Sequence, residues 1–307
     1  MTYSTHSIKD WILATRPWSF PASAMPVGVT ILWIFSRQEE ISFTITTSSW
    51  LLGLWTLVNI ILIHAAGNVW SDYFDYRKKV DTSDTYGVRT LVDGIFQPKQ
   101  FLYYSLGLQT VAILGSIGLV CLTGLPLLWI GLCGILLSLC YPLLKYSALG
   151  DLVIMCCYAL LPTLGTTFII TGNILPEILW IAVPVGSITV AILHINNTRD
   201  IETDRRAGIH TFAMLTGRTV AVGVYVFEVL MPYLWIIGLC LASMEPVTIL
   251  LTLLSLPIAI GNVRCVLQYK QKGIESIARL DERTAQLQLV FSLLLMAGLA
   301  GSVLLHG

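Results

Sequence analysis

The chain has 307 residues, of which 55% are hydrophobic and only 12% are charged, and its mean hydropathy is +0.77. Because soluble domains carry about 25% charged residues, this composition excludes an ordinary soluble protein and indicates an integral membrane protein. The formal net charge is zero, which argues against a nucleic-acid partner.

The first segment is MTYSTHSIKDWILATRPW. It lacks a basic region followed by an apolar region and a cleavage site of small residues, so a cleaved signal peptide is not expected. Within it, SIKDWILAT has the pattern of a short interfacial helix. The pair Arg16-Pro17 fits the start of a first span, because proline is tolerated where no helical N–H is needed.

Nine apolar runs follow, each close to the length of about 20 residues that crosses a bilayer. We therefore predict an all-α bundle of nine transmembrane helices, forming a single domain over 1–307 with two motif-bearing halves, roughly 1–145 and 146–307. Pro257 predicts a kink in the short eighth run. The predicted spans are 18–36, 48–70, 101–122, 126–144, 152–172, 177–195, 219–242, 246–262 and 287–305.

The charge distribution orients this bundle. With the N-terminus in the cytoplasm, seventeen of the eighteen Lys and Arg residues fall in cytoplasmic segments, and only Arg37 lies outside. Such asymmetry follows the positive-inside rule. It also supports an odd number of spans, since one span more or fewer would move every later loop to the opposite side of the membrane and remove the asymmetry.

The first acidic cluster, NVWSDYFDYRKKVD at 68–81, begins where the second predicted span ends. Asn68, Asp72 and Asp75 are four and three residues apart, so they share one face if the helix continues past the membrane edge. Carboxylates this close repel one another and are costly near hydrocarbon. A compensating cation is therefore expected at this helix end.

The second cluster, NNTRDIETDRRAG at 196–208, follows the sixth predicted span on the same predicted side of the membrane. Asn197, Asp200 and Asp204 are three and four residues apart, again a helical spacing. Two oxygen-rich helix faces at one end of a bundle predict a site for Mg²⁺, which binds carboxylates together with substrate phosphate oxygens.

Bases in the same predicted layer suit a diphosphate, because they neutralise the charge that builds as it leaves. The apolar bundle beneath suits a long hydrocarbon tail, so the predicted substrate is an amphiphile with a diphosphate head. The alternative is that both clusters are solvated loop surface, although two clusters with matching spacing favour a site. The bases are Arg77, Lys78, Arg89, Lys145, Arg199, Arg205 and Arg206.

Segments along nearly the whole chain resemble the UbiA superfamily of intramembrane prenyltransferases. The Asn-Asn-x-Arg-Asp form of the second cluster and the segment GVRTLVDG resemble the branch that acts on 1,4-dihydroxy-2-naphthoate in menaquinone biosynthesis, including the vertebrate enzyme that makes menaquinone-4. The segments are RPWSFPASAMPVG at 16–28, GVRTLVDG at 87–94, YPLLKYSALGD at 141–151 and NNTRDIETDRRAGIHTFAMLTGR at 196–218.

The first motif departs from the family pattern, Asn-Asp-x-x-Asp-x-x-x-Asp. Ser71 stands where asparagine is usual, and Asp81 follows Asp75 by six residues rather than four, a longer spacing that this branch shares. Either Asn68 or Ser71 takes the place of the usual asparagine.

The resemblance implies transfer of a polyprenyl group from polyprenyl diphosphate to 1,4-dihydroxy-2-naphthoate, with loss of CO₂ and diphosphate, to give demethylmenaquinol. Mg²⁺ is the implied cofactor. The two substrates and the lipid bilayer are the implied partners, with no nucleic acid and no obligate protein partner. The implied location is the cytoplasmic (inner) membrane, with the active site facing the cytoplasm.

Residue roles follow from the matched motifs. Tyr141 and Tyr146 are candidates to shield the carbocation, or they belong to an interfacial belt. The implied catalytic residues are Asp72, Asp75, Asp200 and Asp204, and the implied metal ligands are these four with Asn68 and Asp81. The implied substrate-binding residues are Arg16, Asn68, Arg77, Lys78, Arg89, Tyr141, Lys145, Asn197 and Arg199.

Other interpretations stay open. A related enzyme would use another aromatic acceptor, such as 4-hydroxybenzoate, and a secondary transporter would use the acids as a cation or proton site. The transporter is disfavoured because the acids cluster with bases at one membrane face. His64 and His194 either pack neutral between helices or bind the aromatic substrate. The seven cysteines contain no CxxC pair and are expected to be reduced packing residues.

Overall fold

The computed structural model describes residues 6–40, 45–80 and 90–306, and this part of the chain is almost entirely helical. It contains nine helical segments long and apolar enough to cross a membrane, which confirms the predicted all-α fold and the number of spans. The cytoplasmic position of the N-terminus and the single domain with two halves stay predictions. The segments are Pro17–Ser36, Thr47–Arg77, Pro98–Thr123, Leu125–Lys145, Gly150–Thr171, Pro176–Arg199, Arg218–Leu241, Val247–Ser276 and Leu280–Leu305.

Fourteen α-helices make up these spans and their connections in the described chain. A π-helical turn, Cys156–Leu160, joins α6 to α7, and a 3-10 segment, Val247–Ser255, precedes α12. The helices are α1 Ile8–Ala14, α2 Pro21–Ser36, α3 Thr47–Arg77, α4 Pro98–Thr123, α5 Leu125–Lys145, α6 Gly150–Met155, α7 Leu161–Thr171, α8 Leu179–Arg199, α9 Ile201–Arg206, α10 Phe212–Thr216, α11 Arg218–Leu241, α12 Leu256–Leu267, α13 Tyr269–Lys272 and α14 Leu280–His306.

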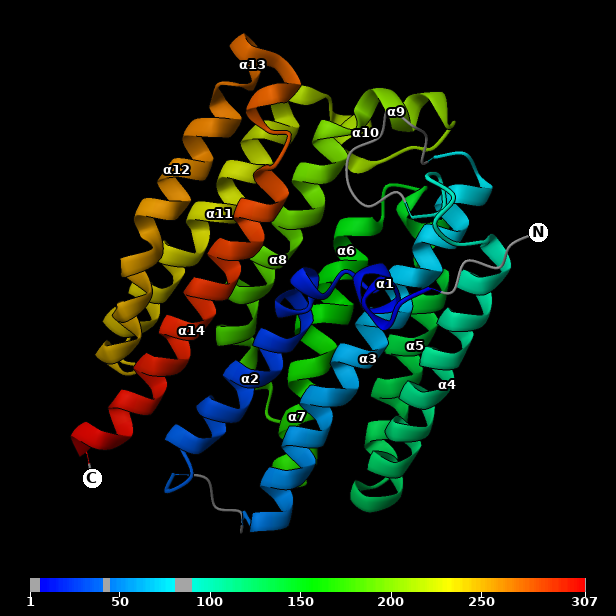
Figure 1. Cartoon of the computed structure of the whole chain (residues 1–307). Helices are drawn as coiled ribbons and strands as arrows, with labels where there is room; N and C mark the ends of the chain where they lie inside the picture. The colour runs from blue at the N-terminus through cyan, green and yellow to red at the C-terminus, as the bar shows by residue number, and fades with distance from the viewer. Residues whose placement is uncertain (1–5, 41–44, 81–89, 307) are drawn as a thin grey trace.

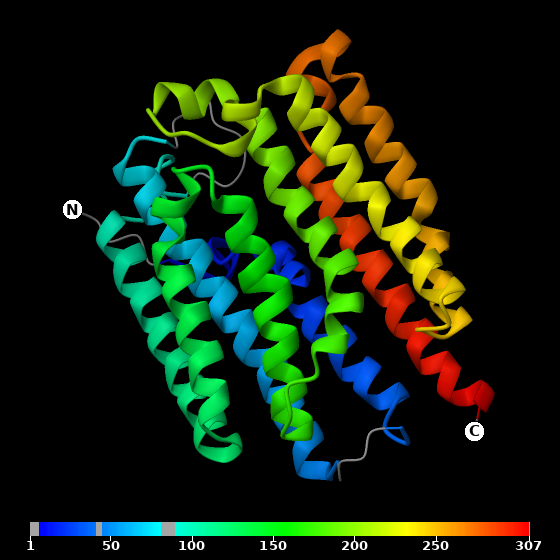
Figure 2. The same cartoon turned by 180° about the vertical axis from the view of Figure 1, so that it is seen from behind.

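The long helices stand side by side in one bundle (Figures 1 and 2). Helices α4 and α5 form one flank, α11 and α12 form the other, and α2, α3, α7 and α8 lie between them. The last turns of α14 lie at the end of the bundle opposite α9 (Figures 1 and 2). Helix α9 lies across the end at which α3 finishes, and we call this the acidic end because Asp72, Asp75, Asp200 and Asp204 lie there.

The eighth span changes helix type just before its proline. The kink predicted at Pro257 stays a prediction, and the span, Val247–Ser276, is not short. Its 3-10 segment ends at Ser255, and Pro257 lies in the first turn of α12, where no helical N–H is required. Helix α14 packs closely against the 3-10 segment, because a Cβ atom at Gly298 would lie 2.6 Å from the carbonyl oxygen of Thr248.

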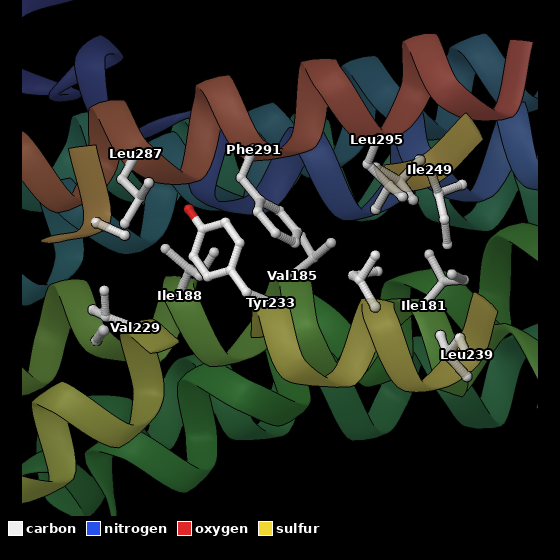
Figure 3. Close-up of a cluster of buried hydrophobic side chains, with 14 of the residues drawn as sticks. Ile181, Val185, Ile188, Val229, Tyr233, Leu239, Ile249, Leu287, Phe291 and Leu295 are labelled. Atoms are coloured by element: carbon white, nitrogen blue, oxygen red, sulfur yellow. The ribbon is translucent and has the colours of Figure 1, made fainter. Parts of the chain in front are cut away.

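A core of buried apolar side chains joins α8, α11 and α14 (Figure 3). Its side chains recur every three or four residues, so each helix turns one stripe toward the other two. The outer faces carry many exposed apolar side chains, as lipid contact requires. The core stripes are Ile181, Val185, Ile188, Ala191 and Ile195 of α8, Tyr225, Val229, Tyr233 and Ile236 of α11, and Leu287, Phe291, Leu295 and Leu299 of α14.

Prolines inside three spans leave backbone carbonyls without their helical donor, and neighbouring helices supply a side chain in its place. Pro232 frees the carbonyl of Glu228, which accepts a hydrogen bond of 2.9 Å from the Ser187 hydroxyl of α8. Pro184 frees the carbonyl of Trp180, which accepts a hydrogen bond of 2.8 Å from Trp235 Nε1 of α11. Pro26 frees the carbonyl of Ala22, and the Thr189 hydroxyl of α8 lies 3.4 Å from it.

All seven cysteines are free, as predicted, but none of them is buried: Cys121, Cys133 and Cys140 are exposed and the other four are partly exposed, so their role in packing stays a prediction.

We predict that Ser187→Ala destabilises the protein by about 1–3 kcal/mol, because it leaves the Glu228 carbonyl buried without a donor. Thermal unfolding in detergent measures the effect. The matched control is Ser105→Ala: this serine is also fully buried, but its hydroxyl donates to Leu102, a carbonyl of its own helix. Equal destabilisation by the two variants would contradict the interhelical role of Ser187.

Candidate active site

A cavity of about 570 Å³ extends from the acidic end into the bundle between α2, α3, α4, α5, α7 and α8. At the acidic end its wall is polar and charged. Deeper in the bundle the wall becomes apolar, through residues such as Ile60, Ile113, Leu128, Ile135 and Leu161. This division suits a ligand with a charged head and an apolar tail.

Negative charge exceeds positive charge in the described part of this wall. Neighbouring carboxylates in a partly desolvated site repel one another, so a site of this composition favours cations. The lining carboxylates are Asp72, Asp75, Asp200, Asp204, Asp281 and Glu282, and the lining bases are Arg16, Lys145 and Arg199.

Asp72 is paired with Arg16, a residue 56 positions earlier in the chain. Arg16 Nη2 donates to Asp72 Oδ1 at 2.7 Å, and the Asp72 side chain is only 6% exposed. The carboxylate comes from the last turns of α3, whereas the guanidinium comes from the turn between α1 and α2. The pair therefore ties the opening segment to the first acidic motif.

The backbone of Arg16 is held in the left-handed region, with φ 54° and ψ 59°. Such a conformation costs about 1–2 kcal/mol for a residue with a Cβ atom and persists only where its surroundings enforce it. Here the Ser19 hydroxyl donates to the Arg16 carbonyl at 2.7 Å. Asn68 Nδ2 donates to the Thr15 carbonyl at 2.9 Å and to Ser19 Oγ at 3.0 Å. Asn68 thus uses its amide nitrogen to hold the turn that presents Arg16.

Asp75, one turn after Asp72, has three donors around it. Lys145 Nζ lies 3.1 Å from Asp75 Oδ2, and the Ser71 hydroxyl donates to the same oxygen at 3.4 Å. The Tyr146 hydroxyl donates to Asp75 Oδ1 at 2.6 Å. The end of α5 is therefore joined to the first acidic motif through two adjacent residues, Lys145 and Tyr146.

The second motif does not continue as one straight helix, so the expectation of a continuous helical face is wrong here. Helix α8 ends at Arg199, Asp200 bends away with φ −93° and ψ 11°, and α9 begins at Ile201. The Arg199 guanidinium chelates the Asp200 carboxylate, with Nε–Oδ1 at 2.8 Å and Nη2–Oδ2 at 2.9 Å. Arg199 Nη1 also reaches Asp281 of α14 at 3.3 Å.

Asp204 of α9 nevertheless returns to the cavity and is 4% exposed. Burial raises the pKa of this carboxyl to about 7; Asp200 and Asp75 add to the rise, whereas Lys145 and Arg199 oppose it. Because Asp75 and Lys145 belong to the other half of the site, this coupling indicates that the two acidic motifs face one another across one space.

Most of the residues that the sequence singled out line this cavity. Arg77 and Lys78 do not: both are exposed, with Arg77 donating to the Tyr73 hydroxyl at 3.1 Å and Lys78 lying 4.1 Å from the centre of the Tyr146 ring. Asp81 and Arg89 lie outside the described residues. The lining residues are Arg16, Asn68, Asp72, Asp75, Tyr141, Lys145, Asn197, Arg199, Asp200 and Asp204.

Two contacts that shape the site do not follow from the sequence. The sequence suggests Tyr146 as an aromatic shield or an interfacial residue, whereas in the structure its hydroxyl donates a hydrogen bond to Asp75. Asp281, which is not among the predicted site residues, lines the cavity and pairs with Arg199. Its only sequence signal is an acidic pair at the start of the last span, a pattern that also suits an ordinary helix N-terminus.

His64 lines the cavity wall below the acids. Its Nδ1 lies 2.8 Å from the Ser23 hydroxyl, its Nε2 lies 3.3 Å from Ser19 Oγ, and its ring lies 4.5 Å from the Tyr158 ring. Both nitrogens are therefore engaged with the protein, and only the ring is offered to a ligand. His194 is buried outside this wall.

Comparison with known proteins identifies the family. A sequence model described as the UbiA prenyltransferase family matches residues 41–280. UbiA prenyltransferase domain-containing protein 1 of Mus musculus is 34% identical over 300 residues, covering 96% of this chain and 84% of the mouse protein. The Homo sapiens protein of the same name is 33% identical over 296 residues, covering 94% and 83%.

Solved structures share the fold at lower identity. A structure of digeranylgeranylglyceryl phosphate synthase matches with a TM-score of 0.60 at 15% identity, over 95% of this chain and 99% of that chain. A UbiA homologue from Archaeoglobus fulgidus bound to GPP and Mg²⁺ matches with a TM-score of 0.57 at 13% identity, over 94% and 99%.

These relatives carry the name of the family rather than that of the naphthoate branch, so the branch assignment stays a proposal. The predicted superfamily, in contrast, is confirmed by sequence over most of the chain and by the fold. The chain belongs to the UbiA prenyltransferase family and is a membrane-spanning prenyltransferase.

Proposed function

We propose that this enzyme transfers a polyprenyl group from its diphosphate to 1,4-dihydroxy-2-naphthoate, releasing diphosphate and CO₂. The observation that carries the proposal is the convergence of Asp72, Asp75, Asp200 and Asp204 on one cavity that continues into an apolar channel. The charged region of the cavity suits the diphosphate, and the apolar region suits the prenyl tail.

Mg²⁺ fits the residues of this site. The donor set consists of carboxylates from two helix ends, which together outnumber the bases, and Mg²⁺ binds carboxylates with substrate phosphate oxygens. When bound, it neutralises charge on the diphosphate and makes it a better leaving group. Related structures were solved with GPP or DMAPP together with Mg²⁺, which supports the same cofactor here.

Three of the four aspartates that we propose as catalytic metal ligands, Asp72, Asp75 and Asp200, begin in contact with bases. Arg16, Lys145 and Arg199 each lie beside one of these acids. When the acids bind a cation, the bases remain within the same wall and can donate to diphosphate oxygens. The pairs therefore keep both kinds of charge in place before the substrate enters, with little reorganisation afterwards.

The chemistry proceeds by charge separation and capture. The bond between the first prenyl carbon and the diphosphate oxygen breaks, and the electron pair leaves with the diphosphate. The electron-rich ring carbon that carries the carboxylate attacks the allylic cation. The carboxylate then leaves as CO₂, returning its bonding electrons to the ring. The apolar wall keeps water from the cation, and the rings of Tyr141 and Tyr158 lie in that wall.

The choice of acceptor rests on the motif form rather than on the cavity. Asn196-Asn197-x-Arg199-Asp200 and GVRTLVDG resemble the naphthoate branch. Asn196 and Asn197 line the cavity beside Asp200, where they can donate hydrogen bonds to a ring carboxylate or hydroxyl. We place the reaction at the cytoplasmic face of the inner membrane, since the bases concentrate at that predicted side.

Acceptor specificity is the direct test. Purified enzyme with Mg²⁺ and a set of polyprenyl diphosphates receives 1,4-dihydroxy-2-naphthoate, a 1,4-naphthoquinol without the carboxylate, or 4-hydroxybenzoate. We expect prenylated product from the naphthoate, with one CO₂ released per diphosphate and a product mass that lacks the carboxyl group. Prenylation of only the naphthoquinol or only 4-hydroxybenzoate would refute the proposed acceptor while leaving the prenyltransferase assignment intact.

Replacing a cavity carboxylate tests the shared metal site. We predict that Asp72→Asn and Asp204→Asn each lower kcat/KM by about 10²–10³-fold, the size typical of removing one electrostatic group from a transition state. The control is Glu202→Gln, which changes an exposed acid of the second motif that pairs with Arg205 and Arg218. Near-normal turnover by both aspartate variants, measured as diphosphate release, would contradict the mechanism.

The raised pKa of Asp204 predicts a pH-dependent effect of Mg²⁺ on stability. The pKa is about 7 in the folded protein and lies near 3.8 when unperturbed, so the charged form is disfavoured by folding. Without metal, this group therefore costs stability as pH rises from about 4 to about 7, on the order of 2–4 kcal/mol at full ionisation. Mg²⁺ favours the carboxylate and offsets this cost.

Thermal unfolding without substrate measures this prediction at pH 5.5 and pH 8, with EDTA or with Mg²⁺. We expect Mg²⁺ to raise the Tm of the wild type more at pH 8 than at pH 5.5. In EDTA at pH 8, Asp204→Asn should be more stable than the wild type, and the difference should shrink at pH 5.5. A variant no more stable than the wild type at either pH would rule out this account.

A further inference from the structure

A second group of ionisable side chains lies outside the cavity wall. Asp151 of α6, His194 of α8 and Glu228 of α11 each offer a ligand atom, and these atoms lie within 4.8 Å of one another. His194 is fully buried, and Glu228 is 9% exposed. An imidazole and two carboxylates from three different helices thus converge in the interior of a membrane bundle, where isolated charges are costly.

The hydrogen bonds of His194 define its tautomer. Its Nε2 lies 2.9 Å from the Ala221 carbonyl oxygen, which can only accept, so Nε2 carries a proton. In a neutral imidazole, Nδ1 then turns its lone pair to Asp151 Oδ2, at 2.9 Å. Two acceptor atoms approach this closely only with a proton or a metal ion between them, and the site of this proton can also hold a metal. Donation of the far ring nitrogen to a backbone carbonyl is the usual arrangement of a metal-bound histidine.

Glu228 adds an independent indication of a ligand. Its Oε2 is buried and accepts no hydrogen bond from the described residues. The backbone of Glu228 is held in place, because the Ser187 hydroxyl donates to its carbonyl. An unsatisfied carboxylate oxygen in such an interior is destabilising, and a bound cation would satisfy it. One divalent ion would also cancel the formal charge of the two carboxylates.

The cluster is reachable from the acidic end. The Asp151 side chain is 17% exposed, and its Oδ1 lies 3.5 Å from Asn197 Nδ2, a residue of the cavity wall. The ligand types differ from those of the cavity, which offers oxygen atoms. Mg²⁺ prefers an all-oxygen, octahedral set, whereas an imidazole with two carboxylates suits Zn²⁺.

We propose that Asp151, His194 and Glu228 form a second metal site, which binds one Zn²⁺-type divalent ion and is separate from the diphosphate site. The ion joins α6, α8 and α11 directly below the second acidic motif. Through Asp151 it also fixes the position of Asn197, so the site supports the cavity wall without touching the substrate.

Metal content tests this proposal on the whole protein. Purified protein in detergent is stripped with EDTA, loaded with ZnCl₂, passed over a desalting column and measured by mass spectrometry of the metal. We expect the wild type to retain close to one equivalent, and we expect His194→Ala and Glu228→Gln to retain only background. Asp72→Asn is the control and should retain zinc, because it changes only the diphosphate site.

Two outcomes would overturn the proposal. One is a wild type that keeps no zinc after loading, which would leave protons as the only ions shared by the cluster. The other is zinc that persists in both His194→Ala and Glu228→Gln. X-ray absorption at the zinc edge gives a readout that does not depend on variant folding: the bound metal should show one imidazole, with nitrogen and oxygen neighbours at about 2.0–2.2 Å.

Discussion

Carboxylates buried at the edge of a low-dielectric bundle need positive partners, and this requirement organises the acidic end of the protein. Each of three site aspartates is paired with a base, two of them from a distant segment of the chain. Two of the pairs fasten the turn before α2 and the end of α5 to α3, and the third lies at the bend between α8 and α9. These pairs are Arg16–Asp72, Lys145–Asp75 and Arg199–Asp200.

Backbone carbonyls inside the bilayer also need partners within the protein, because no water reaches them there. Helix α8 supplies hydroxyl groups to carbonyls that prolines free in α2 and α11, and α11 returns an indole N–H to α8. The prolines thus shape the spans while adding contacts between them. Glu228 takes part both in these interhelical hydrogen bonds and in the cluster of Asp151, His194 and Glu228. Its carbonyl accepts a hydrogen bond from Ser187, and its carboxylate lies near His194.

The sequence predicted the spans and the faces of the helices well, because both depend on local periodicity. Asn68, Asp72 and Asp75 share one face of α3, as their spacing required. At Asp200 the chain departs from the continuous helix that the same argument assumed, although Asn197, Asp200 and Asp204 all line the cavity. Spacing alone does not reveal this turn, because the same spacing also fits a continuous helix. At the turn, Arg199 lies 3.3 Å from Asp281 of α14.

The sequence by itself determined the membrane class, the number of spans and the two acidic motifs, since these follow from composition and from short repeats along one chain. Only the tertiary structure decided which neighbours each motif meets. It turned Arg77 and Lys78 away from the cavity, gave Asp75 a donor in Tyr146, and brought Asp281 into the wall. The physical reason is that periodicity sets the direction of a side chain on its own helix, whereas its partners depend on how distant helices pack.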